Sequence, residues 1–437
     1  MDLNRRKNIL RNLQTDILQN EKEILDALKK DLNKCEFEGV ATEVQYVLSE
    51  LTHILKKISS WVKPKKVFTP LLHWPAKSYI HYEPYGEVLI IGPWNYPFQL
   101  ILSPLIGAIS AGNTVVIKPS EISHHTSLVI ERILSQDKYK NYITVIQGGV
   151  EETTKLLQKR FDYIFYTGST PVGKIIMEAA AKNLTPVTLE LGGKSPTVVT
   201  KFANLKVAAR RTLWGKLMNA GQTCIAPDYI YVDESIKSQF IECLKSEVKS
   251  LYGNDPKKSN DFGRIINERH FDRLTGFIPQ KCLIGGESEK EIKYIAPTVF
   301  EANENDPVMQ DEIFGPLLPI LTYKDTSEAV KKIKEKEKPL AFYLFSDNNS
   351  EINYFKNEIS SGGMCINDTL IHIANGKLPF GGVGHSGMGV YHGHFSFETF
   401  SHQKSVVHRK SYLDVKLKYP PYFGKLKIVR WLLKFVG

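Results

Sequence analysis

The sequence predicts an α/β fold built from two doubly wound parallel-sheet lobes. The first observation is a repeated alternation of short apolar runs with amphipathic segments over residues 88–182. The second is that the alternation resumes after residue 188 and continues through LLPILTY and PLAFYLFS to GGMCIND. Buried parallel strands joined by helices give this pattern. A chain of 437 residues is long enough for two or three such units.

The N-terminal region predicts helices followed by a strand. Apolar residues recur at helical spacing between charged residues over 2–34 and again over 42–62, and Pro64 ends the second segment. The stretch SYIHYE, at residues 78–83, alternates between apolar and polar side chains. This period of two predicts a strand.

Polar residues follow the ends of the next two apolar runs. VLII ends at residue 91 and is followed by Asn95, while TVVIK ends at Lys118 and is followed by Glu121. Ligands of open α/β sheets bind at the carboxyl ends of strands. The side-chain NH₂ of Asn95 is suited to stabilise a developing oxyanion, but an Asn here could equally cap the helix expected near Pro97. The residue alone leaves both interpretations open.

A third run, FDYIFY, leads directly into a turn that opens a helix. The turn reads GSTPVG, from Gly168 through Ser169 to Gly173. This spacing is not GxGxxG, so the usual dinucleotide fingerprint is absent. Small residues before a helix still allow backbone N–H groups to approach a phosphate. The turn therefore indicates a phosphate site only weakly.

Cys224 is the candidate nucleophile, in the stretch AGQTCIAPDY at residues 220–229. A thiolate attacks a carbonyl carbon when a base or a lowered pKa supplies it. A lone cysteine is more often a small core residue. Two carboxylates lie in nearby motifs, Glu190 in TLELGGKSP and Glu312 in EIFGP, and a glycine-dense loop, LPFGGVGHSGMG, follows at residues 378–389.

Composition excludes several other classes of protein. The formal net charge is +10, yet no aromatic RNA-binding signature or zinc-finger spacing accompanies it, so we expect no nucleic acid partner. Five widely spaced cysteines predict free thiols in a reducing compartment. His392 and His394 have no third ligand nearby, so we expect no metal. The charged N-terminus and the absence of a run of about 18 apolar residues predict a cytoplasmic protein without a spanning helix.

The four motifs around Cys224, in this order and spacing, resemble those of the aldehyde dehydrogenase superfamily. The resemblance runs over residues 3–410 and is strongest to the class 3 branch, which acts on fatty and medium-chain aldehydes. It implies NAD(P)-dependent oxidation of medium- or long-chain aliphatic or aromatic aldehydes to carboxylic acids, through a cysteine thiohemiacetal and a thioester. It also implies an aldehyde dehydrogenase-like fold, in which a small oligomerisation sheet accompanies the two lobes.

The resemblance implies roles for named residues. Cys224 is the nucleophile, Asn95 stabilises the oxyanion, and Glu190 or Glu312 is the general base, with Glu190 preferred. The cofactor-binding residues are Lys118, Glu121, Gly168, Ser169, Gly173, Glu312 and Phe314. Because a carboxylate at position 121 favours a ribose 2′-OH over a 2′-phosphate, we expect NAD to be preferred and NADP to be accepted. A cofactor-independent thiol esterase and a non-catalytic binding protein are the alternatives; the nucleotide-type turns and the intact Cys224 argue against them.

The resemblance also predicts domain organisation and assembly. We expect a dinucleotide-binding domain over residues 1–187, interrupted by the oligomerisation strand at 78–83, and a catalytic domain over 188–391. An oligomerisation segment over 392–410 and a basic tail over 411–437 follow. A homodimer is the expected assembly, since strands near both 78–83 and 405–408 would otherwise be exposed edges.

The tail predicts a short basic amphipathic helix over residues 425–436. At 100° per residue, Ile428, Val429 and Leu432 share one face and Lys427 and Arg430 the opposite face. Such a helix is suited to peripheral contact with the inner face of a membrane. The alternative is that the apolar face packs on a partner subunit or over the substrate entrance.

Overall fold

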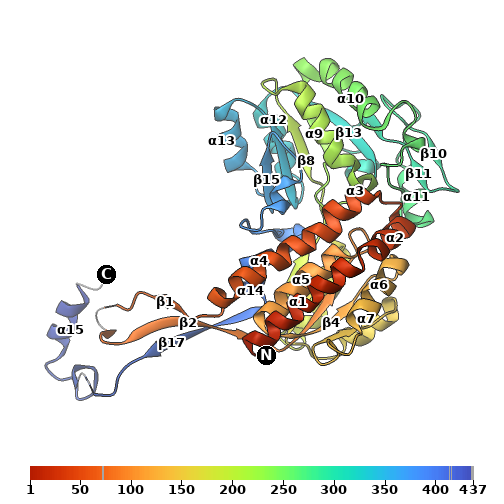
Figure 1. The fold of residues 1–437 in the computed structure, drawn as a ribbon. Coiled ribbons are helices and arrows are strands. Elements are labelled where there is room, and N and C mark those ends of the chain that lie inside the picture. Colours follow the sequence, from red (N-terminus) through yellow and green to blue (C-terminus); the bar gives the residue numbers. More distant parts are fainter. Residues whose placement is uncertain (71–72, 413, 415, 435–437) are drawn as a thin grey trace.

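The computed structural model describes residues 1–70, 73–412, 414 and 416–434. Two sheets, each flanked by helices, form the body, and the N-terminal helices lie beside them (Figure 1). A long arm of strands leaves the body and ends near the C-terminal helix (Figure 1).

The first sheet is parallel except at one edge. Its strand order is β16-β7-β6-β3-β4-β5, and only β16 runs antiparallel. The strands are β3 (Glu87–Ile91), β4 (Thr114–Lys118), β5 (Ile143–Val145), β6 (Tyr163–Thr167), β7 (Val187–Glu190) and β16 (Gly387–Met388). The connecting helices are α5 (Gln99–Ala111), α6 (His124–Leu134), α7 (Val150–Leu157) and α8 (Thr170–Ala181). This confirms the first predicted lobe.

The second sheet is parallel throughout, with strand order β12-β13-β9-β8-β14-β15. Its strands are β8 (Pro196–Val199), β9 (Tyr229–Asp233), β12 (Thr298–Glu301), β13 (Leu317–Tyr323), β14 (Ala341–Phe345) and β15 (Gly363–Ile366). Its helices are α9 (Leu205–Leu217), α10 (Lys237–Tyr252), α11 (Glu268–Thr275), α12 (Thr326–Lys334) and α13 (Asn349–Glu358), and a short hairpin joins β10 (Ser288–Glu289) to β11 (Tyr294–Ile295). The second predicted lobe is confirmed as well.

The predicted N-terminal helices are present, with a break between them. They are α1 (Leu3–Gln19), α2 (Glu21–Leu32), α3 (Glu36–Gly39), a π-helical turn η1 (Val40–Val44) and α4 (Gln45–Trp61). The side chain of Asp2 caps α1 by accepting the N–H of Arg5, and Asn33 ends α2 in a left-handed conformation. The apolar positions that predicted these helices, such as Leu13 and Leu51, are buried in the core of the first lobe.

The arm is a three-stranded antiparallel sheet of β1 (Lys65–Val67), β2 (Lys77–Pro84) and β17 (Ser401–His408). It is the small additional sheet that was predicted. Helix α14 (His394–Thr399) precedes β17, and α15 (Leu426–Leu433) follows it. Helix α15 is shorter than the predicted 425–436, of which residues 435 and 436 lie outside the described part of the chain.

Among the residues that the structure describes, no helix is long and apolar enough to cross a bilayer. Helix α9 ends at Leu217, and a 3₁₀ turn, η3 (Met218–Gly221), follows it. Asn219 and Ala220 in this turn have φ of 53° and 52°, which an α-helix does not permit. The turn ends at Gly221, three residues before Cys224.

Candidate active site

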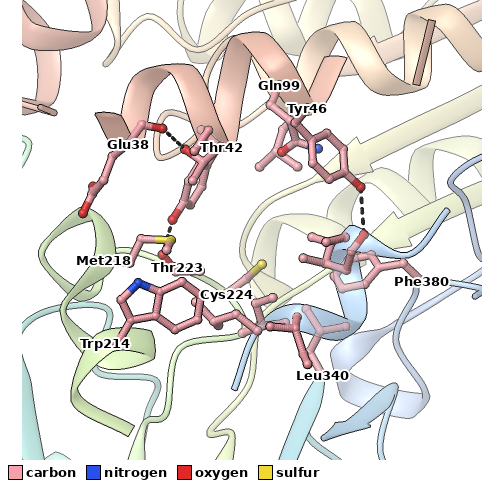
Figure 2. A pocket seen from close by; sticks show the side chains of 18 of the residues that line it. Glu38, Thr42, Tyr46, Gln99, Trp214, Met218, Thr223, Cys224, Leu340 and Phe380 are labelled. Carbon is pink, nitrogen blue, oxygen red and sulfur yellow. Dashed lines mark hydrogen bonds between the residues drawn. The ribbon is translucent and has the colours of Figure 1, made fainter. Parts of the chain in front are cut away.

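Cys224 faces a cavity of about 730 Å³, lined by side chains of the N-terminal helices and of both lobes. Figure 2 shows its sulfur pointing into the space between Thr42 and Tyr46 on one side and Trp214 and Met218 on the other. The lining is mainly aromatic and aliphatic, which suits an apolar substrate. Its aromatic side chains include Phe37, Tyr46, Tyr96, Trp214, Phe380 and Tyr391.

Several groups around the thiol of Cys224 shift its pKa in opposite directions. Burial raises the pKa, and the nearby carboxyl groups of Glu312 and Glu190 raise it further. The backbone N–H groups of Cys224 and Ile225 are directed at the sulfur and lower the pKa, but burial prevails. The thiol therefore needs a base to remove its proton when it attacks a carbonyl carbon.

Glu190 lies at the carboxyl end of β7 and also lines the cavity. Its side chain is buried, and neither carboxyl oxygen has a hydrogen-bond partner among the described residues. Burial raises its pKa well above the usual value. A buried carboxyl group without a protein partner is costly for stability, so this arrangement points to a role in chemistry.

Glu312 also lies close to the thiol of Cys224, but unlike Glu190 it has neighbouring groups that interact with its carboxylate. Burial raises its pKa to about 8, while the N–H of Gly193 and the ammonium of Lys194 lower it. A Cβ at Gly192 would lie 2.0 Å from a carboxyl oxygen of Glu312, so only glycine admits the carboxyl group there. The ring of Phe314 packs edge-on against Trp94, with centroids 5.2 Å apart.

Asn95 is held beside the loop that carries Cys224. Its Nδ2 donates to the carbonyl of Gln222 at 3.0 Å, and its side chain is buried. Helix α5 begins at Gln99, and its first turn has no side-chain cap from the residue preceding it. The structure therefore directs the amide of Asn95 to the cysteine loop rather than to the end of α5.

Residues that could hold a dinucleotide gather at the carboxyl edge of the first sheet. The ammonium of Lys118 is buried at the end of β4 and donates to the carbonyl of Pro119 at 2.8 Å and to Glu121 at 3.3 Å. The Glu121 side chain is 46% exposed, so its carboxylate can accept hydrogen bonds from a ligand. These groups fit the hydroxyls of a ribose.

The predicted phosphate turn lies where β6 meets α8. A Cβ at Gly168 would lie 2.2 Å from the hydroxyl of Tyr166, and one at Gly173 would lie 2.7 Å from the side chain of Leu191. Ser169 precedes α8 without capping it through its side chain. The N-terminal N–H groups of α8 therefore remain available to an anion, and the residues present fit a dinucleotide phosphate.

Several residues that shape the site were not predicted from the sequence. They are Glu38 and Tyr46 in the cavity wall, Asn219 in the turn before the cysteine, and the buried pair Lys34 and Glu43. For Glu43 the available signal was a charged residue beside the apolar positions that predict a helix, whereas Lys34 follows the last such position, Leu32, and gave no signal. In the part of the chain that the structure describes, no group of three or more His, Cys, Asp or Glu side chains could hold a metal ion.

Known proteins resemble this chain over nearly its whole length. The profile described as Aldehyde dehydrogenase family matches residues 1–406. The 4,4'-diaponeurosporen-aldehyde dehydrogenase of Staphylococcus aureus (strain NCTC 8325 / PS 47) is 49% identical over 437 residues, covering 99% of this chain and 95% of that protein. The dimeric NADP-preferring aldehyde dehydrogenase of Rattus norvegicus is 50% identical over 419 residues, covering 95% of this chain and 92% of the relative.

Solved structures agree with the fold. The substrate-bound state of Staphylococcus aureus AldH superposes with a TM-score of 0.97 at 48% identity, covering 99% of this chain and 95% of that one. The GapN glyceraldehyde-3-phosphate dehydrogenase of Methanocaldococcus jannaschii, complexed with NADP, has a TM-score of 0.84 at 26% identity and covers 94% and 90%. The likeness extends over both lobes and the arm.

Proposed function

Because the chain belongs to the aldehyde dehydrogenase family, we propose that Cys224 is the nucleophile of its reaction, the NAD(P)-dependent oxidation of aldehydes to carboxylic acids. The observation that carries this assignment is the position of the thiol. It faces an apolar cavity within electrostatic reach of two buried carboxyl groups, Glu190 and Glu312. The apolar lining supports medium- or long-chain aliphatic or aromatic aldehydes as substrates.

In the first step the thiol loses its proton and the sulfur bonds to the aldehyde carbon, which forms a thiohemiacetal. Because the pKa of Cys224 is raised, a base must take the proton as the bond forms. The carbonyl oxygen gains negative charge. We assign its stabilisation to the side-chain amide of Asn95 and to the backbone N–H of Cys224.

In the second step the carbon attached to sulfur loses a hydride, for which NAD(P) would be the acceptor when bound, and Cys224 is left carrying a thioester. Glu190 then takes a proton from water, whose oxygen bonds to the acyl carbon. The carbon–sulfur bond breaks, the carboxylic acid leaves, and the thiol recovers a proton. We assign this base to Glu190 because its carboxyl oxygens have no partner among the described residues, whereas Gly193 already donates to Glu312.

The remaining candidates are assigned to the cofactor. Lys118 and Glu121 would hold the adenosine ribose, and the turn from Gly168 to Gly173, with Ser169, would receive the phosphates. Glu312 would hold the nicotinamide ribose, and Phe314 would lie near the nicotinamide ring. A carboxylate at position 121 repels a 2′-phosphate, so NAD should give a higher kcat/KM than NADP, although the rat relative is named NADP-preferring. Steady-state assays with both cofactors test this order.

We also propose a domain division, an assembly and a site of action. Residues 1–187 bind the dinucleotide, 188–391 carry the chemistry, and 392–410 join an interface between two copies of the chain. The rat relative, named dimeric, supports a homodimer.

The tail, residues 411–437, makes peripheral contact with a membrane through α15. Apolar aldehydes partition into membranes, so this contact would bring the enzyme to its substrates. The lysines and arginines of the tail support attraction to anionic lipid.

The experiment that tests the nucleophile is Cys224→Ala in the full chain. We expect aldehyde oxidation to fall by several orders of magnitude, because no other group present forms the covalent intermediate. Fluorescence titration should show NAD binding within about threefold of wild type. Turnover of the variant within about tenfold of wild type would contradict the assignment. Matched Cys365→Ala, which removes a cysteine outside the cavity lining, serves as the control.

A further inference from the structure

The N-terminal helices contain a fully buried ion pair, Lys34 and Glu43. The Nζ of Lys34 lies 2.5 Å from Oε1 of Glu43, and both side chains are 0% exposed. Removing two charges from water is costly, and apolar residues of similar size often stabilise a fold as well or better. Stability alone therefore does not explain the pair, and the groups around it indicate a second role.

Both members of the pair also bind one short segment, residues 95–99. The second carboxyl oxygen of Glu43 accepts the N–H groups of Phe98 at 3.1 Å and Gln99 at 2.9 Å. The ammonium of Lys34 donates to the carbonyl of Asn95 at 3.4 Å. It also lies 4.1 Å from the centre of the Tyr96 ring. Among the described residues, all side-chain hydrogen bonds that the pair makes outside itself go to this segment.

The same helices also hold the carbonyl of Asn95 indirectly, through the turn that leads to the cysteine. Asn219 donates from Nδ2 to the carbonyl of Asn95 at 2.8 Å and to that of Gln222 at 3.2 Å. The backbone N–H of Asn219 in turn donates to the carboxylate of Glu38 in α3 at 3.0 Å. The backbone of Asn95 is thus bonded on its carbonyl by two donors, while its side chain reaches the carbonyl of Gln222.

A local irregularity of the helix brings Glu43 to this position. Residues 40–44 form the π-helical turn η1, and α4 continues from Gln45. A π turn contains one residue more than an α turn, so it shifts the faces of the helix on either side. Within η1, Glu43 and its neighbour Val44 are both buried. The π turn therefore places the carboxylate of Glu43 in the interior, beside the apolar face that continues into α4.

We propose that Lys34 and Glu43 are positioning residues for catalysis, which set the backbone of Asn95 so that its amide meets the oxyanion. The inference rests on the proposed role of Asn95. Loss of an oxyanion donor costs about 10²–10³-fold in kcat. Displacement of a catalytic group by about 1 Å can cost about 10²-fold. The pair acts through Asn95 and contacts no reacting atom.

The first test is Glu43→Gln. A glutamine keeps the shape but presents an NH₂ group either to the ammonium of Lys34 or to the N–H groups of Phe98 and Gln99, so one set of bonds is lost. We expect kcat for aldehyde oxidation to fall by about tenfold or more, while KM for NAD and for aldehyde stays within about twofold. Lys34→Met is the second variant; burial raises the pKa of Glu43, so a protonated carboxyl group can remain without its partner.

The matched control is Asp31→Asn. Asp31 is also a buried carboxylate of the N-terminal helices, and it also accepts backbone N–H groups at the start of a helix, from His125 at 3.1 Å and Thr126 at 2.8 Å. That helix is α6, away from the cysteine loop. A purely structural role predicts a similar loss of thermal stability in both variants with kcat unchanged, and that result would overturn the proposal.

A double-mutant cycle with Asn95→Ala separates this inference from the function on which it rests. If the pair acts through Asn95, Glu43→Gln should reduce kcat little further in the Asn95→Ala background. Losses that multiply would overturn the inference while leaving Asn95 as the oxyanion donor. If Asn95→Ala by itself leaves kcat unchanged, the proposed role of Asn95 fails and the inference fails with it.

Discussion

At the scale of single residues, two buried carboxyl groups beside one thiol differ in their partners. Glu190 has none among the described residues, whereas Glu312 accepts the N–H of Gly193 and lies against Gly192. Burial raises the pKa of both. A carboxyl group accepts a proton only when it is ionised, and a raised pKa moves ionisation to higher pH. Thioester hydrolysis should therefore accelerate as the pH rises. For Glu312 the ionised form would increase through a pH of about 8.

Glu190→Gln should slow hydrolysis of the thioester more than its formation. Removal of a general base costs about 10²–10⁴-fold, so stopped-flow absorbance should show a burst of reduced cofactor followed by a slow steady state. The rise of the steady-state rate with pH that is due to Glu190 should also be lost. Glu312→Gln is the matched variant. A burst in Glu312→Gln together with none in Glu190→Gln would reverse the assignment of the two carboxyl groups.

At the scale of elements, helix α15 has no buried residue, whereas each of the other α-helices in the described chain has at least one. Ile428 and Leu433 are 51% exposed on it, and the helix lies at the far end of the arm, away from the body of the molecule (Figure 1). Lys427 and Arg430 lie on the same short helix. This combination favours an interfacial membrane contact.

Vesicle co-sedimentation should therefore depend on α15. The full chain should sediment with vesicles that contain anionic lipid, less so at high salt, because each basic residue near the surface contributes about 1 kcal/mol. A chain that ends at Tyr422 and the variant Leu433→Asp should both sediment less. Leu18→Asp, which changes an exposed leucine on α1, is the control. Equal sedimentation of full and shortened chains would exclude the membrane contact.

At the scale of the whole molecule, the arm leaves a strand edge open. Strand β17 pairs with β2 on one side, and on the other it has no strand partner in the described part of the chain. Val407 on this strand is 65% exposed. Unpaired edges invite pairing with another chain, which supports a dimer through the arm.

Light scattering should give a mass of about twice the 49.6 kDa chain at micromolar concentration. The substitution Val407→Lys should shift the equilibrium toward the monomer, because a charge disfavours burial at an interface. Leu18→Lys, with a comparable exposed side chain on α1, should leave the mass unchanged. A monomeric wild-type chain would contradict the proposed assembly.

The sequence by itself predicted most of the elements and the residues of the proposed site. Apolar periodicity is a local property, so the strand before Asn95, the strand that ends at Lys118 and the helices within residues 2–62 could be predicted from nearby residues alone. The rule that ligands bind at the carboxyl ends of parallel strands then indicated the edge at which a cofactor would lie. The motif around Cys224 indicated the proposed nucleophile by resemblance.

The tertiary structure decided what could not be read locally. Glu43 and Gln99 are 56 residues apart in sequence, and Asn95 and Asn219 are 124 apart, so their hydrogen bonds depend on how the helices and lobes pack. The choice between a helix cap and the cysteine loop for Asn95 was settled in the same way, by its bond to Gln222. Local patterns specify which residues are helical or extended, whereas the partner of a buried polar group exists only once distant segments have met.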